Sequence, residues 1–387
     1  MAKWQSGKVA KYLVTLPPLP MKTIHHHPYF INLLLLLMAF VVSVAIGAVA
    51  IAPDTVIRVF LAKILWIIED VAGVFEPDTV IRLFLAEISG LAVLNDWPQA
   101  TETIIFKVRL PHTVLILLTG AALAGSGAAY QGLFRNPLAD PYLIGVASGA
   151  GLGAVVAMSR SWPNDWFSVY AVPFGAFLAA LLTVFIVYTL ARTGNTLRTT
   201  TLILAGVAVS SFATALTSFL MLRSSAEMQR ALGWLLGGGM LAGWTPVLGI
   251  LPYSCVGLGI LIFLGHPLNV LQFGDEQAAQ MGLSVERTKR IIIVVASLTT
   301  AAAVAFSGII GFVGLIVPHL IRMVWGPDYR LLIPLSIIGG ATLLLLADVL
   351  ARVVMAPQVL PLGIVTAMLG APFFLWILWR SKSSVTW

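Results

Sequence analysis

The sequence QFGDEQAAQMGLSVERTKR, residues 272–290, is a short polar segment between two long apolar ones. In a chain with only 10% charged residues, it contains six: Asp275, Glu276, Glu286, Arg287, Lys289 and Arg290. The apolar segments on either side are long enough to cross a hydrocarbon core of about 30 Å. The polar segment must therefore lie in water at a membrane face, and this alternation decides the fold.

Apolar segments of spanning length recur along the whole chain. The composition is 59% hydrophobic, whereas an average soluble domain is about 45–50% apolar. We therefore predict an all-α polytopic membrane protein, a compact bundle of about ten transmembrane helices within residues 30–379. The predicted spans are 30–52, 110–131, 141–158, 170–190, 201–221, 246–264, 289–306, 308–325, 331–350 and 361–379.

Composition also excludes several classes of site. The net charge of +7 comes from basic residues scattered among loops, which indicates membrane orientation rather than nucleic-acid binding. The single cysteine, Cys255, rules out an intrachain disulfide and a cysteine-based metal site. His25, His26 and His27 have no cysteine or carboxylate nearby, so a solvated tail is favoured over a metal site. We expect no cofactor and no metal.

The distribution of Lys and Arg predicts the orientation. With the N-terminus in the cytoplasm, 14 of the 23 Lys and Arg residues fall on the cytoplasmic side. In short loops alone the ratio is 14 to 4, as the positive-inside rule requires. We expect a basic cytoplasmic tail (1–29), an outer loop (53–109), a cytoplasmic loop (265–288) and a second cytoplasmic tail (380–387).

The predicted outer loop contains a local duplication. Residues 53–64, PDTVIRVFLAKI, recur as residues 77–88, PDTVIRLFLAEI, with ten of twelve positions identical. Both copies have the pattern of short amphipathic helices with Asp near the N-terminus. We favour a duplication without separate activity over a thickened docking surface.

Within the opening segment, Glu276–Gly282 is predicted to be a short helix that ends at glycine. A helix docked between two spans is typical of a contact point for another protein, because ordering a loop has an entropic cost that contacts must offset. The alternative is a solvated surface loop.

Two further patterns concern packing. Small residues four apart, at Ala121, Gly125 and Ala129, predict close helix contacts within the bundle. Trp234–Gly239 is too short to span and too apolar for a free loop, so we expect a half-buried re-entrant segment.

Several longer motifs resemble the FecCD-type permeases, the membrane subunits of ATP-driven importers for ferric siderophores, haem and vitamin B12. The resemblance covers roughly residues 108–379. It rests on RLPH (109–112), GAALAGSG (120–127), NPLADP (136–141), LAGV (204–207), GFVGLIVPH (311–319) and LPLGIVTA (360–367).

The resemblance implies a homodimer in the lipid bilayer, with a substrate path between the subunits. It also implies cytoplasmic ATP-binding subunits docked on the polar segment and an extracytoplasmic binding protein outside. The chain contains no G-x-x-x-x-G-K-[ST] sequence, so we expect ATP hydrolysis on a partner and no enzyme activity here. We expect a bacterial inner-membrane location, with ferric siderophore as substrate and cobalamin or haem as the alternatives.

Three residues are matched to binding-protein docking by the resemblance: Arg109, Arg352 and, where the family's vitamin B12 importer has a third arginine, His112. Histidine is mostly neutral at pH 7, so its salt bridge would be weaker or pH-dependent. The alternative for Arg109 is an anchor at the headgroups. Asp348 lies four residues before Arg352, and we favour an i,i+4 ion pair between them over a separate functional role.

The candidate sites on the cytoplasmic side are of two kinds. Coupling to the ATPase is expected from Asp275, Glu276, Ala279 and Gly282. The resemblance places Thr199 and Thr200 at an inner gate, although a simple helix N-cap explains a threonine there almost as well.

Two other function classes stay open. A secondary transporter driven by an ion gradient would work without ATP, and a membrane scaffold would move no substrate. In a secondary transporter the polar helix Glu276–Gly282 would have no assigned use. The scarcity of charge inside the spans would also leave such a transporter without an ion path.

Overall fold

The computed structural model describes residues 27–47, 51–72, 97–160, 166–194, 196–222, 225–238 and 242–383. The longer helices are α2 (Pro28–Ala45), α3 (Pro53–Ala72), α6 (Leu110–Phe134), α7 (Val146–Met158), α8 (Trp166–Ala191), α9 (Thr199–Met221), α11 (Trp244–Phe263), α14 (Val285–Ser307), α15 (Val313–Trp325), α16 (Tyr329–Val353) and α17 (Leu362–Ser383). The shorter ones are α5 (Gln99–Thr103), η2 (Ile104–Arg109), η3 (Pro141–Ile144), α10 (Ser225–Gly233), η4 (Trp234–Gly238), α12 (Gly265–Leu271) and α13 (Asp275–Gln280).

The helices confirm the predicted fold class. Within the described ranges, seven helices have the length and apolar composition needed to cross a membrane, and three shorter apolar helices accompany them. These ten coincide with the ten predicted spans. A two-stranded antiparallel hairpin, β1 (Arg192–Thr193) and β2 (Thr196–Leu197), joins α8 to α9 and was not predicted.

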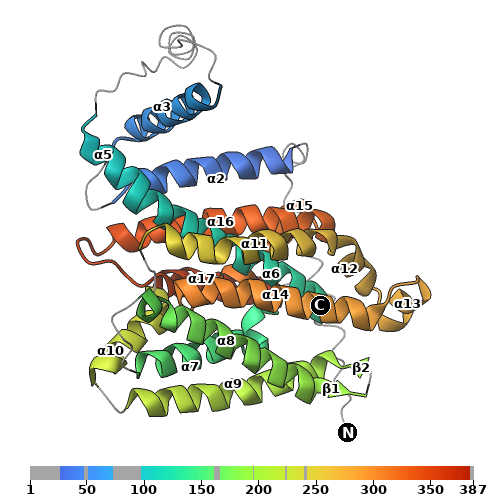
Figure 1. Ribbon diagram of the computed structural model, residues 1–387. Helices are drawn as coiled ribbons and strands as arrows, with labels where there is room; N and C mark the ends of the chain where they lie inside the picture. Colours follow the sequence, from blue (N-terminus) through green and yellow to red (C-terminus); the bar gives the residue numbers. More distant parts are fainter. Residues whose placement is uncertain are drawn as a thin grey trace.

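Helix α6 is the centre of the bundle (Figure 1). It packs against α16, α14, α11 and α15. Glycine makes the closest approaches possible: a Cβ at Gly120 would overlap the Gly340 carbonyl of α16, and one at Gly127 would overlap the Gly314 carbonyl of α15. Because lipid supplies no hydrophobic drive between helices, this close backbone contact is what holds them together.

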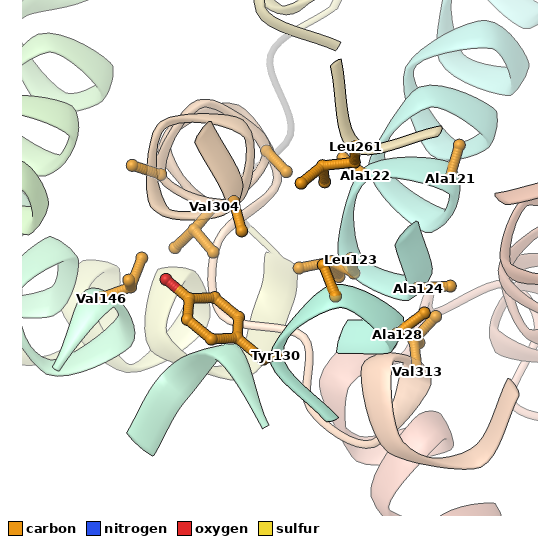
Figure 2. Close-up of a cluster of buried hydrophobic side chains, with 14 of the residues drawn as sticks. Ala121, Ala122, Leu123, Ala124, Ala128, Tyr130, Val146, Leu261, Val304 and Val313 are labelled. Atoms are coloured by element: carbon orange, nitrogen blue, oxygen red, sulfur yellow. The ribbon is translucent and has the colours of Figure 1, made fainter. Parts of the chain in front are cut away.

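Small side chains fill the resulting core. Figure 2 shows Ala122 and Leu123 of α6 directed toward the neighbouring helices, with Val304 of α14 and Leu261 of α11 close by. The exception in size is Tyr130, which is fully buried. Its hydroxyl lies 2.7 Å from the Ser297 hydroxyl of α14, so this polar group is satisfied in the apolar interior.

A second group of helices lies on the far side of α14 (Figure 1). Helices α7, α8 and α9 pack against one another, and α14 contacts α7 and α8. The chain then passes through α10 and η4. Trp234 and Gly237 of η4 are buried, in agreement with the predicted re-entrant segment.

The first copy of the duplicated sequence forms the N-terminal part of α3, which continues to Ala72. Asp54 is in its first turn and forms an ion pair of 2.9 Å with Arg58. Phe60 packs against Phe40 of α2 and Phe106 of η2, with ring centroids 6.1 and 5.5 Å apart. The second copy, residues 77–88, lies outside the described residues.

The bundle has two distinct ends (Figure 1). We call the end with α12, α13 and the β1–β2 hairpin the coupling end, and the end with α10, α5 and the α16–α17 connection the rim. Helix α2 runs from the coupling end to the rim, and α17 runs back again. Pro28 and Ser383, the first and last helical residues described, therefore lie toward the same end.

Candidate functional site

Helix α13 projects from the coupling end as a short helix between two glycines. Gly274 precedes it with φ 106° and Gly282 follows it with φ 85°, a backbone region that other residues rarely adopt. Ala278, a residue of α13, is buried. The chain can therefore turn sharply on both sides, and one face of the helix is anchored to the protein.

The outer face of α13 is exposed. The predicted coupling residues Glu276, Ala279 and Gly282 all lie on this exposed part of the chain. Two large apolar residues flank them, with Phe273 61% and Met281 60% exposed. An apolar pair beside a carboxylate at a water-facing end is typical of a protein-docking surface.

Asp275 is also exposed, at 46% of its side chain, but its carboxylate pairs with α14. Its carboxylate lies 2.6 Å from Nζ of Lys289, whose side chain is only 3% exposed. A weaker contact of 3.9 Å links Asp275 to Arg135 at the end of α6. Asp275 is thus a connection from the docking helix to the bundle, because a buried ammonium needs an anionic partner.

The predicted gate residues lie at the start of α9, next to this connection. Arg198 occupies the N-cap position, so Thr199 and Thr200 are the first two residues of the helix and not its cap. The preceding β2 strand is held by α14: the Leu197 amide donates to Oε2 of Glu286 over 3.1 Å. Glu286 in turn lies 4.0 Å from Lys289.

A groove runs along α9 toward the rim. It has a volume of about 590 Å³ and is lined mainly by hydroxyl-bearing and small residues. The lining residues are Tyr142, Leu143, Val207, Ser210, Ser211, Thr214, Ala215 and Ser218.

Two neighbouring grooves continue this one. The first, of about 500 Å³, shares Tyr142, Ser210 and Thr214 with it and reaches Leu235 of η4. The second, of about 520 Å³, lies between η4 and α17 and is lined by apolar residues that include Met368. None of the residues that line the three grooves is charged, so this face could pass a large solute without holding it by ion pairs.

At the rim, Arg109 is buried. Its guanidinium donates to the carbonyl oxygens of Val44 and Ala45 over 2.8 Å each, and its exposed fraction is 8%. Arg109 therefore satisfies carbonyls at the C-terminal end of α2, where a cation is also favoured by the helix dipole.

Arg352 has a similar position. It donates to the carbonyls of Ile46 and Ser43, and it pairs with Asp348 over 2.7 Å, so the predicted i,i+4 ion pair is confirmed. Asp348 also accepts a contact of 2.9 Å from Nε2 of His112. Of the three candidate docking residues, His112 has the most accessible side chain, at 35%.

A family model, the FecCD transport family, matches residues 35–380. The chain belongs to this family. It is accordingly a membrane permease subunit of an ABC importer, and the family implies ATPase and binding-protein partners.

Curated relatives cover most of this FecCD permease. The cobalamin import system permease protein of Halobacterium salinarum is 46% identical over 73% of this chain and 74% of its own. The hemin transport system permease protein of Yersinia pestis is 42% identical over 71% and 83%. A solved ABC transporter of the metal-chelate type, in an inward-facing conformation, superposes with a TM-score of 0.73 and 28% identity over 91% and 98%.

Sequence reasoning missed several residues that the FecCD fold brings to these sites. Lys289 and Glu286 were counted only as charges of a water-facing segment. In the structure, the start of α14 places Lys289 against Asp275 of α13 and Glu286 against the Leu197 amide of β2. Phe273 and Met281 were not singled out, because an apolar residue beside a span gives no signal of its own. The groove hydroxyls of α9, such as Ser210 and Thr214, repeat at helical spacing, and that periodicity could have been read from the sequence.

Proposed function

We propose that this FecCD permease works as a homodimer and imports a large metal chelate along the α9 face, driven by ATPases that dock on α13. A binding protein delivers the chelate at the rim. The location is the plasma membrane of a bacterium, with both chain ends in the cytoplasm. The position of Pro28 and Ser383 toward the same end of the bundle supports placing both chain ends on one side.

The observation that carries the proposal is the hydroxyl-lined groove on α9. Only 22% of the most apolar part of α9 is buried, the lowest share among the seven long spans found in the described residues. Lipid would cover exposed apolar side chains, whereas the row Ser210, Ser211, Thr214 and Ser218 gives this face a polar component. Ser211 and Ser218 donate to carbonyl oxygens of α9 itself, which keeps their hydroxyls satisfied while they line the groove. A second copy facing this groove would enclose a path lined by hydroxyls.

Docking of the ATPase is assigned to α13. Glu276, Ala279 and Gly282 are exposed beside Phe273 and Met281. The small residues allow the helix to enter a groove of the partner, and the two apolar side chains would supply buried area. Asp275, whose carboxylate pairs with Lys289, is expected to transmit the motion to α14.

Docking of the binding protein is assigned chiefly to His112, with Arg352 behind it. His112→Ala should weaken the affinity for the binding protein by more than it lowers thermal stability, because Asp348 keeps its ion pair with Arg352. Unchanged affinity would remove His112 from the docking surface.

For the substrate, cobalamin is the first compound to test, because a 46% identical relative is named for cobalamin import. Haem follows on the same reasoning. Ferric siderophore, favoured by sequence resemblance alone, is the third. All three are large chelates, which an uncharged path can accommodate.

The test is uptake of labelled cobalamin, haem and ferric siderophore into proteoliposomes that contain the permease, its ATPase and its binding protein. Uptake of one chelate that stops when ATP is omitted would support the proposal and identify the substrate. Uptake that persists on an ion gradient without ATP would contradict it, as would the absence of uptake of all three.

A further inference from the structure

The coupling end contains a chain of polar contacts from α13 to the β1–β2 hairpin. Asp275 of α13 lies 2.6 Å from Lys289 of α14, Lys289 lies 4.0 Å from Glu286, and Glu286 accepts the Leu197 amide over 3.1 Å. Leu197 and Lys289 thus lie next to the two oxygens of one carboxylate, Leu197 at Oε2 and Lys289 at Oε1.

The ammonium of Lys289 is the central member of this chain. Its side chain is 3% exposed, and the carboxylates within 4.0 Å of it in the described structure are Asp275 and Glu286. A buried charge without a partner is strongly destabilising. If Asp275 withdraws, Lys289 must therefore turn to Glu286.

Glu286 also binds the hairpin through a hydrogen bond. One of its oxygens accepts from the amide of Leu197, which is itself buried and immediately precedes Arg198 and the start of α9. Oε2 of Glu286 accepts the Leu197 amide, whereas Oε1 lies nearest Lys289. A closer approach of Lys289 would turn the carboxylate and withdraw Oε2 from the amide. The hairpin is then free to move away from α14.

We propose that Lys289 and Glu286 form a switch that converts displacement of α13 into release of the hairpin and the N-terminus of α9. With α13 in place, Asp275 holds Lys289 at 2.6 Å, Glu286 stays 4.0 Å from the ammonium, and the hairpin is held. With α13 displaced, Lys289 moves to Glu286, and the hairpin loses its hydrogen bond to α14. In this switch Lys289 and Glu286 are positioning residues, because they act through Asp275 and the Leu197 amide.

The assignment rests on the proposed function only for its direction, because α13 is the segment on which the ATPase is expected to dock. The contacts themselves can be tested on the full-length permease alone in lipid nanodiscs. The readout is hydrogen exchange of the Leu197 amide, followed by mass spectrometry of a peptide that covers the hairpin.

Asp275→Ala should speed exchange at Leu197 by about tenfold, the factor that corresponds to losing one hydrogen bond to a charged group. The matched control is Glu276→Ala, which removes the other carboxylate of the same first turn but has no contact with Lys289. This control should leave the exchange unchanged. Equal effects of the two variants would overturn the switch, because both remove the same helix-dipole interaction.

The decisive variant is the double substitution Asp275→Ala with Lys289→Met. Without the ammonium there is no competitor for Glu286, so the hairpin should regain its parental protection. A purely structural loosening of the coupling end would instead become worse in the double variant, and that result would overturn the proposal. An unchanged exchange rate of the Leu197 amide in the Asp275→Ala variant would also overturn the proposal.

A second route changes Glu286 and leaves the ammonium of Lys289 in place. Glu286→Gln keeps an acceptor for the Leu197 amide but loses the charge that attracts Lys289, so combining it with Asp275→Ala should also retain protection.

In the complete transporter, Lys289→Met should keep ATP hydrolysis while uptake per ATP falls. Failure of uptake in the parental complex would contradict the proposed function, whereas the exchange results would still decide the switch.

Discussion

At the scale of single residues, arginines at the rim serve the protein's own backbone. Arg109 and Arg352 satisfy carbonyls at the end of α2. The sequence resemblance matches the same residues to binding-protein docking. The two roles predict different outcomes, because a structural arginine affects stability and a docking arginine affects affinity.

Arg109→Ala should lower the free energy of unfolding by about 2–3 kcal/mol, since it leaves two buried carbonyls without a charged donor. The measurement is thermal unfolding of the purified permease in detergent. Lys107→Ala, an exposed position on the same η2 turn, is the control and should be neutral. A stable Arg109→Ala variant with reduced affinity for the binding protein would show that docking is its main role.

At the scale of elements, the position of α6 depends on glycine at its crossings. Gly127 lies so close to α15 that a Cβ would overlap the Gly314 carbonyl, a backbone atom that cannot rotate away. Helical glycines that face open space impose no such restriction, although in sequence the two kinds look alike.

Gly127→Ala should destabilise the bundle by about 1–3 kcal/mol, the usual cost of overpacking. Gly259→Ala on α11 is the matched control, because nothing lies within 4 Å of its Cβ position. The control should be neutral or slightly stabilising, since alanine is the better helix former. Equal melting temperatures of the two variants would show that α6 and α15 can separate without cost.

A second prediction at this scale concerns the start of α16. Asp328 accepts from the Arg330 amide over 3.0 Å and from Asn269 of α12 over 2.6 Å. Hydrogen bonds from the Arg330 side chain hold the pKa of Asp328 below its usual range. Asp328 therefore ties α12, and with it the coupling end, to α16.

Asp328→Ala should lower the free energy of unfolding by about 1 kcal/mol at neutral pH, as for other helix caps. Because the folded-state pKa is depressed, the contribution of the charge is present above the unfolded pKa of about 3.9 and is lost as pH falls through the folded value. Unfolding measured from pH 7 down to pH 3 should show the parent and the variant converging. If the free energies of unfolding of the parent and the variant differ by the same amount at every pH, the effect comes from the shape of the side chain and not from its charge.

At the scale of the whole molecule, the groove on α9 is the feature that a single copy leaves unfinished. Helix α9, which contributes most of its lining, lies on the side of the bundle away from α2 and α16 (Figure 1). The proposed path therefore requires a second chain, and a block in the groove should stop transport without disturbing the coupling end.

Thr214→Trp should reduce chelate uptake by tenfold or more, while binding of the ATPase to the permease stays at the parental level. Phe185→Trp on α8 is the control, since Phe185 is 64% exposed but does not line the groove. Uptake and co-purification of the ATPase are the two measurements. Normal uptake by Thr214→Trp would move the path elsewhere.

The sequence by itself determined the ten apolar helices, the re-entrant segment at Trp234 and the short helix α13. These follow from local rules: apolar length, glycine at helix ends and charge in loops. It also determined the i,i+4 pair of Asp348 and Arg352, because one helix sets that spacing.

Only the tertiary structure decided which distant groups meet. Nothing in the local sequence indicates that His112 reaches Asp348, or that Glu286 accepts the Leu197 amide. These contacts depend on how helices cross, and the crossings depend on which glycines face a neighbouring backbone. Helix length is encoded locally, whereas helix contact is a property of the assembled bundle.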